Sequence, residues 1–371
     1  MTDDDTNEDN MPYPSDTESY EDLLDRDDEI AAYMRARKSA VSRNTWEQYG
    51  TALRHLAEFV DDRAINLGEL DDDDAADLIS WLKAKESTTD GTVKDYTRLM
   101  AQMYHYGIRR KKSDDFAEIT YNAIAVARED EQWNDDRPTE RRDIPLKVMR
   151  QAVLSIRHPL LLCIVVMLLK TGMRVSEMVN LDMRDVNLDH HWFQKHFDEC
   201  RQNLAEKPDT LYVASAAEMR VGEVVNGEER KDPNKRKRGT YIPIDNELKA
   251  VMLLWLAIRP PSRSPAEPFF CLTTPGSNSI PGDRLQSDYV WSLITDWTEE
   301  QGWWESGATL KTNVSTHYFR HYFRTVFGSR VDDYQLVKYL RGDKGESMDD
   351  YYHYWGDYVR EPYLQAIYKL F

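Results

Sequence analysis

The segment Val314–Tyr352 holds residues whose types and spacing could act on a phosphate. Ser315 or Thr316 suits the N-cap of a helix, which would place His317 and Arg320 three residues apart on one face of its first turns. A cationic pair at the positively polarised end of a helix favours an anion. A His-x-x-Arg pair on an amphipathic helix is more often part of a solvated face, so this site needs support from elsewhere in the chain.

A second candidate is Arg174, which follows the strongly apolar segment 159–169 and the dipeptide Thr171-Gly172. An arginine at the end of so apolar an element keeps its proton, and burying it without a partner is costly. Arg174 therefore requires an anion. That anion is either a substrate group or a neighbouring carboxylate such as Glu177.

Two basic runs add further positive charge. The run Lys235–Arg238 precedes the strand candidate 240–244 and ends a long polar excursion that begins after the strand candidate 211–215, a pattern typical of a hairpin with a large or mobile loop. The run Arg109-Arg110-Lys111-Lys112 ends a helical segment. It suits either DNA contact or simple compensation of the helix dipole.

The formal net charge of −18 argues against a nucleic-acid partner, since DNA affinity depends on basic residues that neutralise phosphates. The acids are nevertheless spread along the whole chain, for example at 3–5, 71–74 and 135–136. Such a pattern is typical of proteins from salt-loving organisms, whose surfaces carry carboxylates throughout. The total charge therefore does not exclude local basic patches.

Composition excludes several other classes of protein. Three scattered cysteines do not make a disulfide framework, and His190, His191, His196 and Cys200 complete no recognisable zinc spacing. No apolar run reaches the roughly 18 residues that span a bilayer, and the N-terminus opens with acids instead of a signal peptide. We expect a cytoplasmic protein without a membrane span or a metal site.

Periodicity predicts a mainly α protein with two domains. Residues 1–27 are acidic and predicted to be disordered, whereas 28–128 repeat apolar residues every three to four positions, as a helical bundle does. The charged segment 129–144 indicates a linker. Residues 145–371 indicate a second domain, rich in helices and containing a small antiparallel β-sheet.

Together these features resemble the tyrosine recombinase (phage integrase) family, and the acidic composition is similar to that of its haloarchaeal members. The resemblance covers about residues 30–365, and the segment Ser42-Arg-Asn-Thr-Trp-Glu-Gln-Tyr is similar to the family's helical, SAM-like core-binding domain. It implies catalytic roles for six positions. These are the arginines Arg174 and Arg320, the lysine Lys235 with Lys237 as the alternative, His317, the nucleophile Tyr352, and Asp343 at a phosphate-contacting position.

Asp343 departs from the family pattern, in which His or Trp usually follows the glycine at this point. One hydrogen bond to phosphate is then missing or comes from another group. The long excursion before Lys235 is the second departure.

The resemblance implies a site-specific recombinase that cuts and rejoins double-stranded DNA through a 3′-phosphotyrosine, without metal or cofactor. It also implies a homo-oligomer, a tetramer on DNA, whose C-terminal segments are exchanged between protomers. Apolar and aromatic residues recur at helical spacing in the last segment, at Tyr363, Leu364, Ile367, Tyr368 and Phe371. This helix must bury its apolar face, either on a neighbouring protomer or on its own domain. The alternatives are a catalytically inactive DNA-binding regulator and a strand swivel similar to type IB topoisomerases. Predicted DNA contacts are Arg109, Arg110, Lys111, Lys112, Arg236, Lys237 and Arg238.

Overall fold

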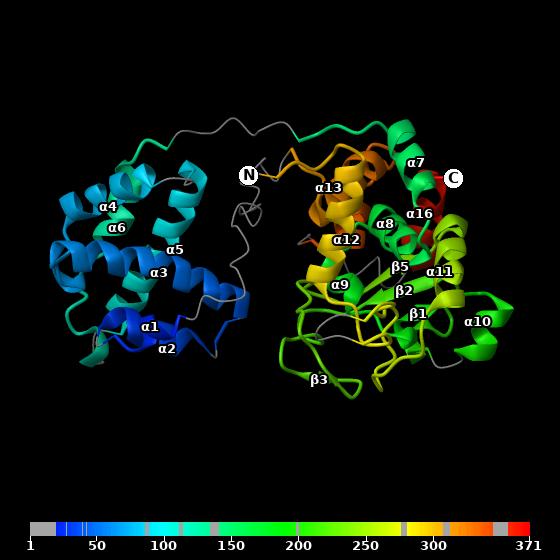
Figure 1. Cartoon of the computed structure of the whole chain (residues 1–371), viewed down its shortest axis with the longest axis horizontal. Helices are drawn as coiled ribbons and strands as arrows, with labels where there is room; N and C mark the ends of the chain where they lie inside the picture. Colours follow the sequence, from blue (N-terminus) through cyan, green and yellow to red (C-terminus); the bar gives the residue numbers. More distant parts are fainter. Residues whose placement is uncertain are drawn as a thin grey trace. The chain divides into compact units, whose positions relative to one another are not determined.

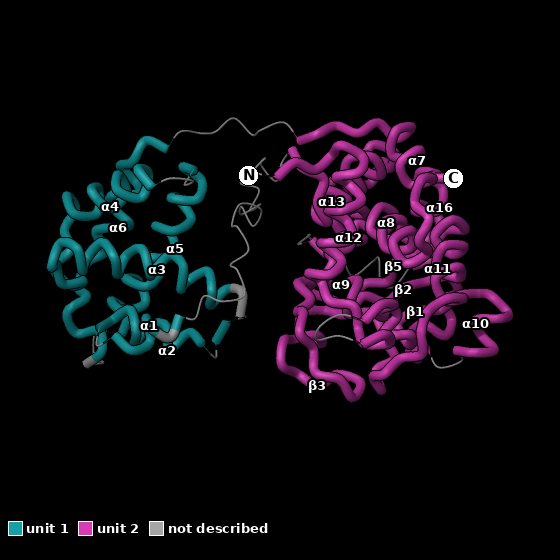
Figure 2. Tube along the Cα trace, in the orientation of Figure 1, with its two compact units in different colours: residues 1–139 teal, residues 140–371 magenta. Residues whose placement is uncertain are grey.

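A computed structural model of the 371-residue chain describes most of the sequence. The described residues are 20–26, 28–38, 40–41, 43–85, 89–110, 114–133, 141–197, 200–275, 280–306, 312–343 and 355–371. They form two compact units, residues 1–139 and 140–371 (Figure 2). The predicted mainly α fold with a small antiparallel sheet is confirmed.

The first unit is helical (Figure 1). Local sequence explains its helix starts: Asp71 and Asp74 form a capping box, and the Thr89 side chain accepts a hydrogen bond from the backbone N–H of Thr92. The apolar faces of these helices pack into one core. The helices are α1 (Glu21–Leu24), α2 (Glu29–Lys38), α3 (Arg43–Arg63), α4 (Asp72–Ala84), α5 (Asp90–Arg109) and α6 (Ala123–Asp130), with 3-10 turns at Leu67–Glu69 and Asp114–Phe116.

The predicted disorder of residues 1–27 is wrong for the last part of that segment. α1 lies within it, and both Tyr20 and Leu23 are buried in the core of the first unit. The Tyr20 hydroxyl also lies 2.8 Å from the Thr51 hydroxyl on α3. The prediction rested on the acidic composition of the segment. Burial of the two apolar side chains of Tyr20 and Leu23 nevertheless holds this one turn of helix on the core of the first unit.

The second unit is built around α8 (Pro159–Thr171), whose side chains are apolar almost all round. Helices α7, α11, α12 and α13 pack against it (Figure 1). The helices of this unit are α7 (Leu146–Ser155), α8, α9 (Val175–Val179), α10 (His191–His196), α11 (Asn246–Ile258), α12 (Ser287–Glu300), α13 (Thr316–Gly328), α14 (Tyr334–Arg341) and α16 (Glu361–Ala366), with 3-10 turns at Met183–Asp185 and Gln202–Leu204 and a π-helical turn at Gly356–Arg360.

The main sheet has three antiparallel strands in the order β1-β2-β5, where β1 is Val186–Asn187, β2 is Thr210–Val213 and β5 is Thr240–Pro243. β2 and β5 form the predicted hairpin, with Leu211 opposite Ile242. The excursion between them contains a second ladder of β3 (Val224–Val225) and β4 (Glu228–Glu229).

Buried ion pairs anchor the excursion between β2 and β5 to the rest of the unit. The carboxylate of Asp182 accepts hydrogen bonds from Arg230 at 2.7 Å and from Arg284 at 2.6 Å, and Arg284 also bonds Glu228 at 2.7 Å. Removing one partner would leave a charge buried without compensation, which is strongly destabilising. The excursion is therefore an anchored subdomain, where the sequence indicated a large or mobile loop.

The C-terminal segment closes the core of its own unit. The buried Lys170 ammonium donates hydrogen bonds to Asp245 and Glu247, each at 2.7 Å, and to the Tyr368 carbonyl at 2.6 Å. The Tyr363 hydroxyl donates to the Lys170 carbonyl at 2.9 Å. Of the two expected destinations of this segment, the structure of the single chain shows docking on its own domain. Its aromatic side chains bury their apolar surface within the chain, and its backbone supplies one of the acceptors that the Lys170 charge requires.

Truncation after Arg360 is expected to unfold the second unit. It removes the buried side chains of Tyr363, Tyr368 and Leu370, each worth about 1.5–3 kcal/mol of burial, from a unit of ordinary marginal stability. Thermal unfolding followed by circular dichroism measures this, with Phe371→Ala as the control because that side chain is half exposed. If the thermal unfolding transition of the second unit is unchanged in the truncated chain, the C-terminal segment does not close the core of that unit.

Candidate functional site

The candidate site lies where three segments of the second unit meet around Arg320. This arginine is on the second turn of α13, and its side chain is only 2% exposed. Its Nη1 donates hydrogen bonds to the carbonyls of Gly172 at 2.7 Å and Arg341 at 2.8 Å, and its Nη2 donates to Asp343 Oδ1 at 2.5 Å. Arg320 therefore ties the end of α8 and the end of α14 to α13.

Arg174 reaches the same place from the turn between α8 and α9. Gly172 ends α8 with a φ of 61°, a left-handed conformation in which a Cβ would also collide with the Phe323 ring. Arg174 Nη1 then donates to Glu177 at 3.2 Å, and its Nη2 lies 3.9 Å from Asp343 Oδ1. The salt bridge to Glu177 is thus present, and the side chain, 25% exposed, still faces solvent in part.

Two further arginines complete the cluster. Arg341 Nη1 lies 3.0 Å from Asp343 Oδ2. Arg236 is fully buried, with Nε 3.1 Å from Glu177 Oε2 and Nη1 donating to the Leu340 carbonyl at 2.9 Å. The arginine cluster, as we call it, consists of the four guanidiniums of Arg174, Arg236, Arg320 and Arg341 around the two carboxylates of Glu177 and Asp343, which leaves positive charge in excess.

Electrostatics in the cluster favour an anion. Burial alone would raise the pKa values of Glu177 and Asp343, but the surrounding guanidiniums hold both pKa values below their ordinary range. Burial, reinforced by repulsion from Arg174, lowers the pKa of Arg320 to about 9. A guanidinium whose charged form is penalised in this way gains from an additional negative group nearby.

His317 lies one turn before Arg320 on α13 and is half buried. Its ring centroid is 4.6 Å from that of His321. Burial, and secondarily the proximity of His317, lowers the pKa of His321 to about 2, so His321 is neutral throughout the working range. Of the two imidazoles, His317 is therefore the better candidate for handling a proton.

The basic run before β5 divides into exposed and buried side chains. Lys235, Lys237 and Arg238 are exposed, whereas Arg236 points into the protein. The interpretation of Arg236 as a surface DNA contact is therefore wrong for this conformation, since its guanidinium compensates the buried Glu177 carboxylate. Lys235 directly precedes Arg236 in the sequence, and its own side chain is exposed.

Three predicted site residues lie outside the described part of the chain: Tyr352, Lys111 and Lys112. The structure brings together Arg174, Arg320 and Asp343, with His317 on the same helix as Arg320. Sequence reasoning missed Arg341, although it directly precedes the Gly342-Asp343 pair that was singled out.

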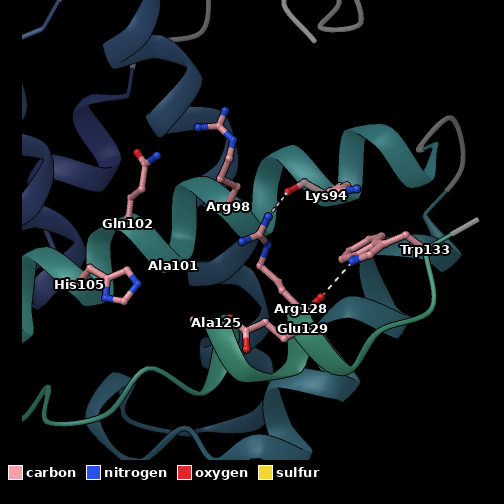
Figure 3. A pocket seen from close by; sticks show the side chains of 9 residues that line it. All are labelled: Lys94, Arg98, Ala101, Gln102, His105, Ala125, Arg128, Glu129 and Trp133. Carbon is pink, nitrogen blue, oxygen red and sulfur yellow. Dashed lines mark hydrogen bonds between the residues drawn. The ribbon is translucent and has the colours of Figure 1, made fainter. Parts of the chain in front are cut away.

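The first unit carries a second basic site that the sequence did not reveal. A pocket of about 450 Å³ lies between α5 and α6 (Figure 3). Lys94, Arg98, Gln102 and His105 recur on one face of α5. The full lining is Lys94, Arg98, Ala101, Gln102, His105, Ala125, Arg128, Glu129 and Trp133.

Neighbouring contacts hold this basic pocket in shape. Arg128 on α6 donates through Nε to the Thr97 hydroxyl at 3.1 Å and through Nη2 to the Lys94 carbonyl at 3.4 Å. The Trp133 indole donates to the Arg128 carbonyl at 3.0 Å. At the end of α5, Arg109 and Arg110 are exposed, and Arg110 lies over the Tyr106 ring at 4.6 Å. Exposed cations beside aromatic rings suit a nucleic-acid backbone.

Among the described residues, no group of three or more His, Cys, Asp or Glu side chains is placed to hold a metal ion. His190, His191 and His196 lie at the two ends of α10. None of the helices in the described ranges is both long enough and apolar enough to cross a membrane.

Comparisons with known proteins agree with this architecture. Residues 28–120 match the family model of the phage integrase SAM-like domain. No curated protein matches the sequence of this chain.

Among solved structures, the Tn1549 transposon integrase in complex with a circular intermediate DNA is similar with a TM-score of 0.60 and 14% identity, covering 86% of this chain and 92% of that one. A lambda integrase dimer bound to a COC′ core site is similar with a TM-score of 0.57 and 13% identity, covering 87% of this chain and 93% of that one. A lambda integrase tetramer bound to a Holliday junction is similar with a TM-score of 0.57 and 14% identity, covering 90% of this chain and 77% of that one. The chain therefore contains a segment that matches the phage integrase SAM-like domain, and its fold is similar to that of the solved Tn1549 and lambda integrases.

Proposed function

We propose that this protein is a site-specific DNA recombinase, or integrase, that cuts and rejoins DNA through a 3′-phosphotyrosine intermediate. The observation that carries the proposal is the convergence of Arg174 and Arg320 from different segments onto one partly exposed point with excess positive charge. The SAM-like match at residues 28–120 and the fold of DNA-bound integrases support it.

The arginines supply the electrostatic part of the reaction. As a phosphodiester is attacked, charge accumulates on its non-bridging oxygens, and guanidinium groups match those oxygens with paired N–H donors. Arg174 and Arg320 are preorganised for this task, since Glu177, Asp343 and two backbone carbonyls fix their side chains. Little reorganisation is then needed when the charge develops.

The covalent step uses Tyr352, His317 and Lys235. The Tyr352 oxygen attacks phosphorus and the bond to the 5′-oxygen breaks, while His317 takes the tyrosyl proton and Lys235 protonates the departing 5′-oxygen. This assistance is needed because a tyrosine with a pKa near 10 is a poor nucleophile at neutral pH. In the second step a 5′-hydroxyl attacks the phosphotyrosine, the proton transfers reverse, and no metal or nucleotide is consumed.

DNA is the proposed partner of the basic pocket in the first unit and of the exposed Arg109, Arg110, Lys237 and Arg238. We further propose a homo-oligomer on DNA, a tetramer, as in the lambda integrase complex with a Holliday junction. The acidic remainder of the surface fits a protein from a haloarchaeal cytoplasm.

The double variant Lys94→Ala/Arg98→Ala is expected to weaken DNA binding about equally for all sequences and to reduce the salt dependence of binding by about two phosphate contacts. Both side chains line the pocket on α5 and lie on its basic face. Fluorescence anisotropy over a range of salt concentrations measures the slope. Lys195→Ala, at an exposed position of α10, is the control with a single lost charge. An unchanged slope in the double variant would remove the pocket from the DNA interface.

Two other functions remain as alternatives. Asp343, which places an acid among the phosphate-binding arginines, favours a DNA-binding regulator without catalysis. A topoisomerase-like strand swivel is disfavoured by the match of residues 28–120 to an integrase-type domain.

The proposed function is tested by trapping the protein on a nicked suicide DNA substrate in the presence of a chelator. We expect a covalent protein–DNA adduct that survives denaturation and forms at the same rate with EDTA as with added magnesium, because protein side chains supply every step. Binding without any adduct would favour the regulator. An adduct that required metal would overturn the mechanism.

A further inference from the structure

Asp343 holds the position in the arginine cluster at which three guanidiniums converge. Its Oδ1 is 2.5 Å from Arg320 Nη2 and 3.9 Å from Arg174 Nη2, and its Oδ2 is 3.0 Å from Arg341 Nη1. A carboxylate and a phosphodiester present the same chemistry to such donors, namely one negative charge shared over two oxygens. The side chain therefore occupies the place that suits a phosphate.

The two carboxylates of the cluster differ in their access to solvent. Glu177 is fully buried and is held by Arg174, by Arg236 and by the backbone N–H of Arg174 at 3.0 Å. Asp343 is 26% exposed. An anion that arrives from solvent can replace Asp343 without disturbing Glu177.

Asp343 and Glu177 do not saturate the cluster. Within the described ranges, Nη2 of Arg236 and Nε of Arg341 are buried without a hydrogen-bond partner. Four guanidiniums against two carboxylates also leave positive charge in excess. A buried donor without an acceptor is unfavourable, so the cluster retains affinity for a further anion.

From these contacts we infer that Asp343 is an internal counter-ion that competes with phosphate for Arg174, Arg320 and Arg341. Asp343 keeps the arginines in place in the free protein and lowers their affinity for a phosphate. A phosphate that other contacts hold firmly, as at a correctly bound DNA site, displaces it more readily than a free phosphate ion does. The choice of a DNA phosphate as the competitor rests on the proposed function, whereas the competition itself does not.

Asp343→Asn isolates the charge of this side chain. The amide oxygen can still accept the hydrogen bond from Arg320, but the negative charge that opposes a phosphate is gone. We expect inorganic phosphate to bind Asp343→Asn at least tenfold more tightly than the parent. We also expect the variant to unfold at a lower temperature without phosphate, since Glu177 alone then compensates the repulsion among the four arginines.

The experiment titrates inorganic phosphate into the full chain and follows thermal unfolding, with sodium chloride adjusted to constant ionic strength. Asp332→Asn is the control, because it removes one exposed carboxylate from the same unit outside the cluster. Asp343→Ser is the second variant in case the amide impairs folding. Equal phosphate dependence in the parent and in both Asp343 variants would overturn the inference. Weaker phosphate binding in the variants would also overturn it, since Asp343 would then organise the site and not compete for it.

The suicide-substrate assay separates this inference from the proposed function. Tighter phosphate binding in Asp343→Asn, without any DNA adduct from the parent or the variant, would support the internal counter-ion and refute the recombinase. DNA adducts combined with identical phosphate titrations would refute the internal counter-ion alone.

Discussion

Tyr352→Phe is expected to abolish covalent attachment to DNA and to leave DNA affinity unchanged. The substitution removes only the attacking oxygen, and no other group of the protein forms a bond to phosphorus in the proposed mechanism. The loss should exceed that from any other single substitution, because the arginines and His317 only lower the barrier of a step that Tyr352 makes possible. Electrophoresis of denatured suicide-substrate complexes measures the adduct, and anisotropy measures binding.

Neighbouring tyrosines supply the controls for this experiment. Tyr351→Phe and Tyr354→Phe should retain the adduct, since the resemblance aligns Tyr352 alone with the nucleophile. Peptide mapping of the parent adduct identifies the modified residue directly. A modified Tyr351 or Tyr354 would show that the register is shifted.

Arg174→Ala and Arg320→Ala are each expected to slow DNA cleavage at least about a hundredfold, the usual scale for loss of one donor to a developing oxyanion. Their effects on stability should differ. Arg174 is partly exposed, so its removal should leave the fold intact. Arg320 is buried and bonds two carbonyls and Asp343, so its removal is expected to cost about 3–5 kcal/mol as well. Single-turnover cleavage rates and urea unfolding measure the two effects.

Arg174→Lys and Arg330→Ala are the matched controls for charge. The lysine keeps the charge of Arg174 without its paired donors, so we expect an intermediate rate. Arg330 is exposed beyond the end of α13, so Arg330→Ala should leave the cleavage rate unchanged. Cleavage by Arg174→Ala at the parent rate would make Arg174 a structural partner of Glu177 only.

The sequence predicted the helical architecture, because apolar periodicity is a local property. The need of a buried guanidinium for an anion singled out Arg174, but its meeting with Arg320 was implied only by the resemblance to the tyrosine recombinase family. It left open whether Arg174 serves Glu177 or a substrate, and the structure shows the first contact while leaving a solvent-facing side for the second. The sequence places Asp343 where the family has His or Trp, but it does not say which group then contacts the phosphate. That question depends on the positions of the guanidiniums around Asp343.

Other features depended on tertiary contacts that no local pattern reports. Arg236 lies between two exposed lysines in an irregular segment, and only the buried Glu177 explains why it points inward. The basic pocket combines one face of α5 with Arg128 from α6, so its charges are not adjacent in the sequence. The C-terminal aromatic residues were recognised as needing burial, but their destination beside α8 was not encoded nearby.

The docking of the C-terminal segment on Lys170 has a consequence for how the protein is made. The Lys170 side chain bonds the carbonyl of a residue 198 positions later, so the second unit cannot complete its core until that residue has left the ribosome. The first unit has all its core residues by Trp133 and can fold while the rest is still being synthesised. During the remaining synthesis the apolar α8 lacks the segment that covers it. The apolar surface exposed during that interval makes the nascent chain prone to aggregation.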